Sequence, residues 1–177
     1  MENNKSSKIF IPKTVDFNNK SNLRSLKSQL EWIKRQLEYS EFSSEYKLRI
    51  ACKRGEIFEF DWGVNVNAEF SNRHYGVVLR DSGEHEPLVL VCPLKTNRYG
   101  AHPASDIDLG YIDALQSESK TLAVVNQTRV LDKMRIFSRT SIGDSQIFDN
   151  KIPVLSEEKL QLILTAYLNF INGKNLL

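Results

Sequence analysis

The stretch that decides the fold class is residues 54–63, which read Arg-Gly-Glu-Ile-Phe-Glu-Phe-Asp-Trp-Gly. Apolar and polar side chains alternate along it, which is typical of a β-strand with one buried face, and the closing glycine suits a loop. A polar loop then leads into a strand-like segment at 73–80 with the apolar residues 77–79, and an apolar stretch at 87–94 ends in the polar residues 95–97. The centre of the chain is therefore predicted to be a sheet with polar side chains at the ends of its strands.

Six short segments in about eighty residues have the composition and alternation of strands, and this number predicts a small, coiled antiparallel barrel. Asp81-Ser82-Gly83 supplies the turn of the central hairpin, because glycine can adopt a positive φ. Residues 113–115 are predicted to form a short helical turn, and residues 136–150 an irregular stretch. The predicted strands are 55–61, 73–80, 87–94, 105–109, 121–126 and 128–131.

The first fifty residues have a different pattern. Residues 1–21 are polar and rich in asparagine and lysine, so we expect a flexible lead-in. Residues 22–50 are predicted to form an amphipathic helix, because leucine and isoleucine recur at spacings of three and four. We expect this apolar stripe to pack on the body of the protein or on a partner subunit, with an independent coiled coil as the alternative. The stripe consists of Leu23, Leu26, Leu30, Ile33 and Leu37.

A second helix is predicted near the C-terminus. Ser156 is a plausible N-cap, two glutamates follow it at the positive end of the helix dipole, and Gly173 comes after the last turn. The apolar face of this helix is expected to be core and is assigned no chemistry. That face consists of Leu160, Ile163, Leu164, Tyr167, Leu168 and Ile171.

The composition is that of an ordinary soluble protein, with 41% hydrophobic and 26% charged residues. The longest apolar run is far short of the ~18 residues needed to span a bilayer, and the N-terminus lacks the apolar core of a signal peptide. Cys52 and Cys92 have no metal-like spacing and suggest no disulfide framework. The sequence also contains no nucleotide-binding glycine motif and no zinc-protease motif. We therefore expect a cytoplasmic protein.

The net charge of +2 hides an asymmetry between the two parts of the chain. Residues 1–54 hold twelve Lys and Arg against six Asp and Glu, whereas residues 55–177 hold twelve against sixteen. A basic arm on an acidic body can attract polyanions or dock on the body itself. Two interpretations stay open for the arm, a role in nucleic-acid binding and an ordinary solvated helix face.

The order of these motifs resembles the MazF/PemK family of toxin–antitoxin endoribonucleases, closely over residues 54–137 and loosely over the C-terminal helix. The resemblance implies an SH3-like antiparallel β-barrel with a C-terminal helix in residues 51–177, to which the helix at 22–50 is an addition. It further implies sequence-specific, metal-independent cleavage of single-stranded RNA, without a cofactor, by the toxin of a type II toxin–antitoxin pair. A cognate antitoxin protein and a homodimer with grooves between its subunits are also implied.

Arg73 and His74 are the first catalytic candidates, because the family has a catalytic residue at this loop-to-strand junction. Metal-free RNA cleavage needs a base for the 2′-hydroxyl proton, an acid for the departing 5′-oxygen and donors for the charge on the phosphate. Histidine suits proton transfer near neutral pH, and the planar arginine fork suits phosphate. Anchoring the motif on Glu69 places the family arginine at His74, whereas omitting one loop residue places it at Arg73. Ordinary residues at a strand edge are the alternative.

Lys95 and Thr96 lie in a segment similar to the family's Pro-(Ile/Leu)-Thr-Ser loop, whose threonine lines the catalytic centre. Here Lys95 occupies the position of that threonine, and Thr96 follows it. Thr96 is the third catalytic candidate because its hydroxyl can donate a hydrogen bond, and Lys95 is a candidate RNA contact because it can neutralise a phosphate. A hairpin tip with ordinary polar residues is the alternative.

Asn126, Gln127 and Arg129 are candidate RNA contacts, because they lie in a segment similar to the family's Glu/Asn-Gln-Ile-Arg run, whose glutamine contacts RNA. Amides can read base edges, since each offers both a donor and an acceptor. The alternative for Arg129 is a structural salt-bridge network with residues 132–135.

Glu69 and Phe70 correspond to family residues in the loop that borders the substrate groove, and both are candidate RNA contacts. Phe70 can stack on a base, although a loop phenylalanine can also be a packing lid. Trp62, at the end of the first strand, is expected to be a packing anchor rather than a stacking platform.

Two other functions stay open for the same fold. CcdB toxins have this barrel and poison DNA gyrase by protein contact, but residues 172–175 lack the Trp-Gly-Ile tail associated with them. The chain can also be an inactive or regulatory member whose N-terminal arm covers the groove. A nuclease requires Arg73 or His74 to converge with Thr96 in one cleft, and this requirement distinguishes it from the alternatives.

Overall fold

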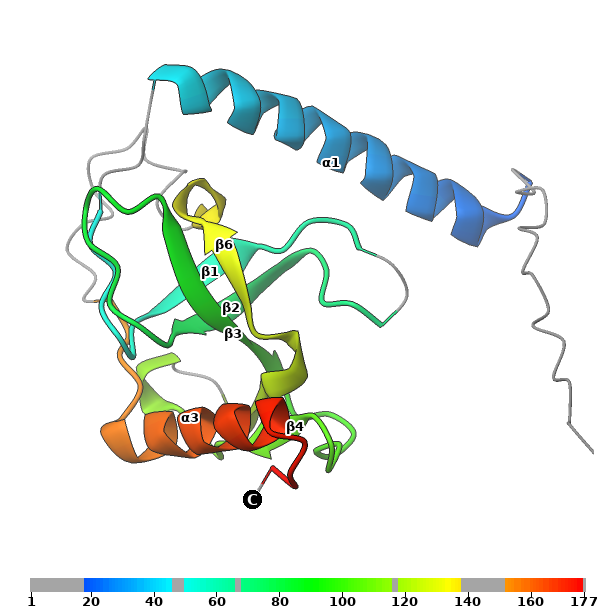
Figure 1. Ribbon diagram of the computed structural model, residues 1–177. Helices are drawn as coiled ribbons and strands as arrows, with labels where there is room; N and C mark the ends of the chain where they lie inside the picture. Colours follow the sequence, from blue (N-terminus) through cyan, green and yellow to red (C-terminus); the bar gives the residue numbers. More distant parts are fainter. Residues whose placement is uncertain (1–17, 46–49, 66–67, 116–117, 138–151, 177) are drawn as a thin grey trace, which may run out of the picture.

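The computed structural model describes residues 18–45, 50–65, 68–115, 118–137 and 152–176. Residues 1–17 of the predicted lead-in 1–21, and all but the first two residues of the predicted irregular stretch 136–150, lie outside them. The helices are α1, Lys20–Glu45, and α3, Glu157–Ile171, and Figure 1 shows them on opposite sides of a curled sheet. Within the described ranges, neither helix is long and apolar enough to cross a membrane.

Six strands form where the alternation predicted them, and every strand end lies within two residues of the prediction. Three 3₁₀ turns accompany the later strands: η1, Asp113–Leu115, η2, Val125–Gln127, and η3, Lys133–Arg135. The first of these turns was predicted. The strands are β1, Ile57–Asp61; β2, Arg73–Val78; β3, Leu88–Thr96; β4, Asp106–Asp108; β5, Thr121–Val124; and β6, Arg129–Asp132.

The long strand β3 organises the sheet, because it pairs with three other strands along its length. Its first half pairs with β6, its middle with β2 and its end with β5, always antiparallel. The sheet order is β1-β2-β3-β5-β4, with β6 attached to β3. The sheet curls as the predicted MazF/PemK-type fold requires, but it is not a closed barrel, because no strand pairing joins β1 to β6 among the described residues. The chain after β6 meets β1 at the isolated bridge Phe60–Ile136 and through the Ile57 amide, which donates to the Pro153 carbonyl oxygen.

Alternation along β1 sends its side chains into two separate cores. Ile57 belongs to the core between the sheet and α3, together with Leu94, Leu160 and Ile163. The next apolar residues, Phe58, Phe60 and Trp62, belong to a second core on the other face, with Val91, Leu131 and Ile136. Trp62 is fully buried, as expected of a packing anchor. The period of two along the strand therefore fixes which side chains of β1 can reach each face.

Helix α3 covers the first core with Leu160, Ile163 and Ala166. Ser156 occupies the N-cap position, although its side chain makes no capping hydrogen bond, and Gly173 follows with φ +66°. Leu168 and Ile171 were predicted to be core but are largely exposed, because they lie in the last turns of the helix beyond the buried stretch. The first half of α3 therefore provides most of its contact with the sheet.

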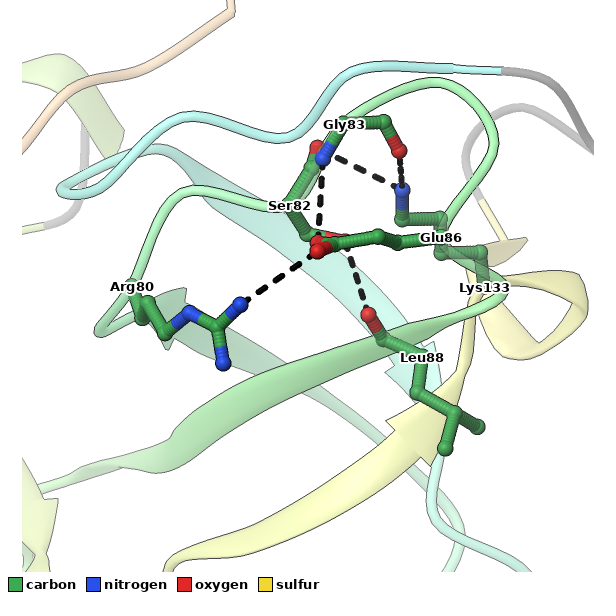
Figure 2. A network of polar contacts seen from close by, with 6 residues as sticks. All are labelled: Arg80, Ser82, Gly83, Glu86, Leu88 and Lys133. Atoms are coloured by element: carbon green, nitrogen blue, oxygen red, sulfur yellow. Dashed lines mark hydrogen bonds and ion pairs between the residues drawn. The ribbon is translucent and has the colours of Figure 1, made fainter.

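Lys133 ties three parts of the chain together. Its side chain is buried, and its ammonium donates to the carbonyl oxygens of Ile50 (2.8 Å), Gly83 (2.6 Å) and Ser82 (3.4 Å). In Figure 2 it lies below the hairpin turn that Glu86 closes by accepting from the Gly83 amide. The segment at 132–135 is thus not the salt-bridge network considered for it, because its buried lysine is satisfied by backbone carbonyls.

Helix α1 reaches the body through an ion pair and aromatic contacts. Nε of Arg35 lies 2.7 Å from Oδ2 of buried Asp61, without the alignment of a hydrogen bond, and the Tyr39 hydroxyl donates to the same oxygen. The Arg135 guanidinium lies 4.9 Å from the centre of the Trp32 ring. Of the two places predicted for the leucine stripe, the body is wrong, because these contacts use a different face of the helix and the stripe is exposed. Its packing on a partner subunit stays a prediction.

Candidate functional site

A cleft of about 220 Å³ lies where the ends of four strands meet. The register places Glu59 of β1 opposite Tyr75 of β2, and Thr96 of β3 opposite Thr121 of β5. All three catalytic candidates come from two neighbouring strands, Arg73 and His74 from β2 and Thr96 from β3. The cleft is lined by Glu59, Arg73, His74, Tyr75, Leu94, Lys95, Thr96, Leu115 and Thr121.

Arg73 and His74 both border this cleft, but neighbouring residues of a strand project to opposite faces. Arg73 therefore shares a face of the sheet with Glu59 and Tyr75. Its guanidinium carbon lies 3.3 Å from the centre of the Phe137 ring, a stacked arrangement that holds the arginine at the end of β2. This arrangement leaves the guanidinium beside the cleft, where its fork can meet an anion.

The imidazole of His74 lies against the loop on the other face of β2. Its ring centre is 4.5 Å from that of Phe70, and partial burial lowers the pKa of His74, although nearby Glu59 and the Ser71 backbone oppose the shift. A lowered pKa keeps the imidazole neutral near pH 7, which is the state that can accept a proton. His74 thus has the electrostatic properties of a general base at the edge of the cleft.

Lys95 is held in place by a buried carboxylate. Its Nζ lies 2.8 Å from Oδ2 of Asp106, which also accepts from the His102 amide. Burial alone would raise the pKa of Asp106, but hydrogen bonds from Lys95, the His102 amide and Ser105 outweigh it and hold the pKa below its usual value. Asp106 therefore stays ionised and fixes the ammonium at the rim of the cleft, next to Thr96.

The other candidate RNA contacts form a second group around Phe70. Oε1 of Gln127 accepts from the Phe70 amide at 3.3 Å, and Nη2 of Arg129 donates to the carbonyl oxygens of Phe70 and Trp62. Burial, and then the charge of Arg135, lower the pKa of Arg129. The side chains of Gln127 and Arg129 therefore hold the backbone of the loop before β2, and this loop carries Phe70, which contacts His74.

Glu69 and Asn126 lie at the exposed margin of this second group. Glu69 acts electrostatically on Arg129, and Asn126 is on η2 beside Gln127. The nine predicted residues therefore fall into two neighbouring groups. Arg73, Lys95 and Thr96 line the cleft, the Phe70 group supports the adjacent loop, and His74 touches both.

Within the residues that the structure describes, no group of three or more His, Cys, Asp or Glu side chains could hold a metal ion. The functional groups that line the cleft are thus a neutral imidazole, a carboxylate, two cationic groups and three hydroxyls. The hydroxyls belong to Thr96, Thr121 and Tyr75. This set combines a proton acceptor with donors suited to an anion.

The family described as "PemK-like, MazF-like toxin of type II toxin-antitoxin system" matches residues 53–166. The chain belongs to this family. MazF (Form-I) from Deinococcus radiodurans is 14% identical with a TM-score of 0.47, over 70% of this chain and 98% of that one. An endoribonuclease in complex with its cognate antitoxin from Mycobacterial species is 15% identical with a TM-score of 0.42, over 67% and 95%. No curated protein is significantly similar to the chain.

Three polar lining residues of this MazF/PemK-family cleft were not predicted as site residues from the sequence: Glu59, Tyr75 and Thr121. Glu59 could have been found, because it is a charged residue within the apolar run of β1, on the face opposite to Phe58 and Phe60. Tyr75 pairs with Glu59 across the two strands, and its side chain is half-exposed. Thr121 gave no signal of its own, since it enters the cleft only through the pairing of β5 with Thr96.

Proposed function

We propose that this chain is a metal-independent endoribonuclease that cleaves single-stranded RNA as the toxin of a type II toxin–antitoxin system. One observation carries the proposal: Arg73, His74 and Thr96, chosen from the sequence, border one cleft although they come from two different strands. Membership of the toxin family supports a nuclease role for these three residues.

In the proposed reaction, neutral His74 accepts the proton of a ribose 2′-hydroxyl. The 2′-oxygen forms a bond to phosphorus, the bond from phosphorus to the 5′-oxygen breaks, and the leaving oxygen takes a proton from solvent. Glu59 stabilises the imidazolium that forms, since its charge already favours protonated His74. The products are a 2′,3′-cyclic phosphate and a free 5′-hydroxyl.

The charge that grows on the phosphate needs preorganised donors. Arg73 offers a planar fork, Lys95 a fixed ammonium and Thr96 a hydroxyl, all on the lining of the cleft. The side chain of Tyr75 is 47% exposed and can stack on a base adjacent to the cleaved bond. Phe70, Asn126 and Glu69 would extend the contact along the strand, with Gln127 and Arg129 supporting them.

The proposal includes partners and domain organisation. A toxin of this family acts with a cognate antitoxin protein, and we propose that residues 51–177 form the toxin domain, as a cytoplasmic homodimer with RNA grooves between its subunits. The N-terminal segment at 22–50, most of which is helix α1, is then an appendage to that domain. The family match at 53–166 is consistent with this division.

The test is incubation of the purified protein with a mixed RNA pool in EDTA, followed by mapping of the new 5′ ends. The account predicts cleavage at a short recurring sequence, with 5′-hydroxyl ends that a kinase labels without prior phosphatase treatment. Activity that disappears in EDTA and returns with Mg²⁺ or Mn²⁺ would contradict the metal-free mechanism. Intact RNA under all conditions would favour a protein-binding poison of the CcdB type.

A further inference from the structure

Helix α1 has two functional faces, which lie on opposite sides of its axis. Successive residues of an α-helix are about 100° apart, and this spacing separates the half-buried positions from the leucine stripe by about half a turn. Apart from Asn22 in the first turn, the half-buried side chains are Ser28, Trp32, Arg35 and Tyr39. Their opposite face carries the leucine stripe of residues 23–37, and its five side chains are 37–60% exposed.

The body contacts fix the direction in which the stripe points. Asp61 binds both Arg35 and Tyr39, one turn apart on the helix. The Trp32 indole lies so close to Gly63 that a Cβ added there would come within 2.8 Å of it. Because these contacts use one face of α1, the stripe must point away from the sheet, and α1 in Figure 1 has no other element above it among the described residues.

An exposed apolar stripe of this kind marks an interaction surface. It extends over residues 23–37, about 21 Å of helix at 1.5 Å per residue. The stripe is also nearly symmetric in sequence, since Leu23 and Leu37 are each seven residues from Leu30. Such a pattern can match itself about a two-fold axis, as isologous interfaces require.

The charges beside the stripe favour an antiparallel match. The first part of α1 carries Lys20, Arg24 and Lys27 and no acidic residue. The later part carries Glu31, Glu38 and Glu41 against Lys34 and Arg35, and Arg35 already neutralises Asp61. An antiparallel pair places the basic part of one helix on the acidic part of the other, whereas a parallel pair places like charges together.

We propose that α1 is a homotypic docking surface, in which the leucine stripes of two copies pack antiparallel about a two-fold axis near Leu30. The body contacts hold the helix already formed, so pairing does not have to order it first. The surface lies outside residues 53–166, so it is separate from any pairing of the toxin domains and independent of the proposed nuclease activity.

The first test is the sedimentation of full-length protein and of two variants over a range of concentrations. Leu30→Asp places a charge on the proposed axis and removes an apolar side chain from both copies. We expect it to weaken self-association about a hundredfold or more, and so to lower the average mass at a given concentration. Gln36→Asp adds the same charge beside the stripe and should leave the mass unchanged. Equal masses for the parent protein and Leu30→Asp would overturn the proposal.

The second test is cross-linking, which reports the direction of the helices and does not depend on other interfaces. Leu23→Cys and Leu37→Cys proteins are mixed and treated with a short thiol cross-linker, while the native Cys52 and Cys92 are buried. The antiparallel pair predicts that the mixed product forms faster than either product of like chains. Dominant products of like chains, or cross-linking no faster than that of Gln36→Cys, would contradict it.

Discussion

Arg35 of α1 and Asp61 of β1 form an ion pair, with 2.7 Å between Nε and Oδ2, that fastens the N-terminal helix to the sheet. The Asp61 side chain is 1% exposed and also accepts from Tyr39 and from the Gly63 amide. A buried carboxylate with these partners is stable only while its cation is present. Among the described residues, Arg35 of α1 is the cation that pairs with this buried charge of the family domain.

Arg35→Met should destabilise the protein, because it leaves the charge of Asp61 buried without its cation. We expect a loss of unfolding free energy near the lower end of about 3–5 kcal/mol, since Arg35 itself is partly exposed. Asp61→Asn in the same chain should restore part of the loss. Urea denaturation of the two single variants and the double variant measures this coupling.

The matched control is Lys34→Met, which removes the neighbouring cation and its exposed pair with Glu38. Such a pair contributes about 0.3–0.5 kcal/mol. Deletion of residues 1–49 should cost less than Arg35→Met alone, because removal of α1 lets water reach Asp61. Equal effects of Arg35→Met and Lys34→Met would show that the ion pair does not hold the helix.

Lys133→Met should be among the most damaging single substitutions on the sheet. It removes the ammonium that donates to the carbonyl oxygens of Ile50, Ser82 and Gly83 next to the second core. The Ser82 and Gly83 oxygens keep a backbone donor, from the Cys52 and Glu86 amides, whereas the Ile50 oxygen loses the Lys133 donor. We expect a loss of about 2–3 kcal/mol in urea denaturation. The exposed Lys53→Met should remain within about 0.5 kcal/mol of the parent protein. Comparable midpoints for the two variants would refute the role of Lys133.

The pH profile of RNA cleavage should show the lowered pKa of His74. The imidazole must be neutral to accept a proton, so kcat/KM should fall as the pH drops through a midpoint below 6.5, the unshifted value. Glu59→Gln removes the charge that favours the imidazolium and should move this midpoint to lower pH. A midpoint that stays in place or rises in Glu59→Gln would show that Glu59 does not stabilise the protonated imidazole of His74.

The same shift has a consequence for stability. Because the pKa of His74 is lower in the folded protein than in the unfolded chain, the unfolded chain binds a proton more readily as the pH falls below 6.5. The stability that neutral His74 contributes is therefore present at neutral pH and is lost on acidification.

The strands were predictable from the sequence because their alternation directly reflects burial on one face, and Phe58, Phe60 and Trp62 follow it in the structure. The face that α1 turns to the body was not predictable in this way. Apolar periodicity predicts that the leucine stripe faces the body. In the structure the opposite face does so, because Arg35 and Tyr39 bind the buried carboxylate of Asp61. That Asp61 is buried, and so can bind α1, follows from the packing of β1 in the folded sheet and not from its local sequence.

The candidate site was predictable where local motifs carried it and not where strand pairing did. Arg73, His74, Lys95 and Thr96 stand at strand ends next to recognisable segments, and all four border the cleft. The sequence predicts Arg129 as an RNA contact, and the structure adds a role in the loop before β2, because its guanidinium donates to the Trp62 and Phe70 carbonyl oxygens. The local sequence could not predict these hydrogen bonds, because their acceptors lie 67 and 59 residues away along the chain.

The most direct test of the central claim, that the cleft at the ends of β1, β2, β3 and β5 is a nuclease site, is the single-turnover cleavage rate of Arg73→Ala on a well-cleaved RNA in EDTA. Loss of a donor to developing charge should reduce the rate about 10²–10³-fold while the melting temperature stays near that of the parent protein. Arg80→Ala removes an exposed arginine from the other end of the β2 hairpin, where it pairs with Glu86, and should cleave at the parental rate. An Arg73→Ala protein as active as Arg80→Ala would contradict the account.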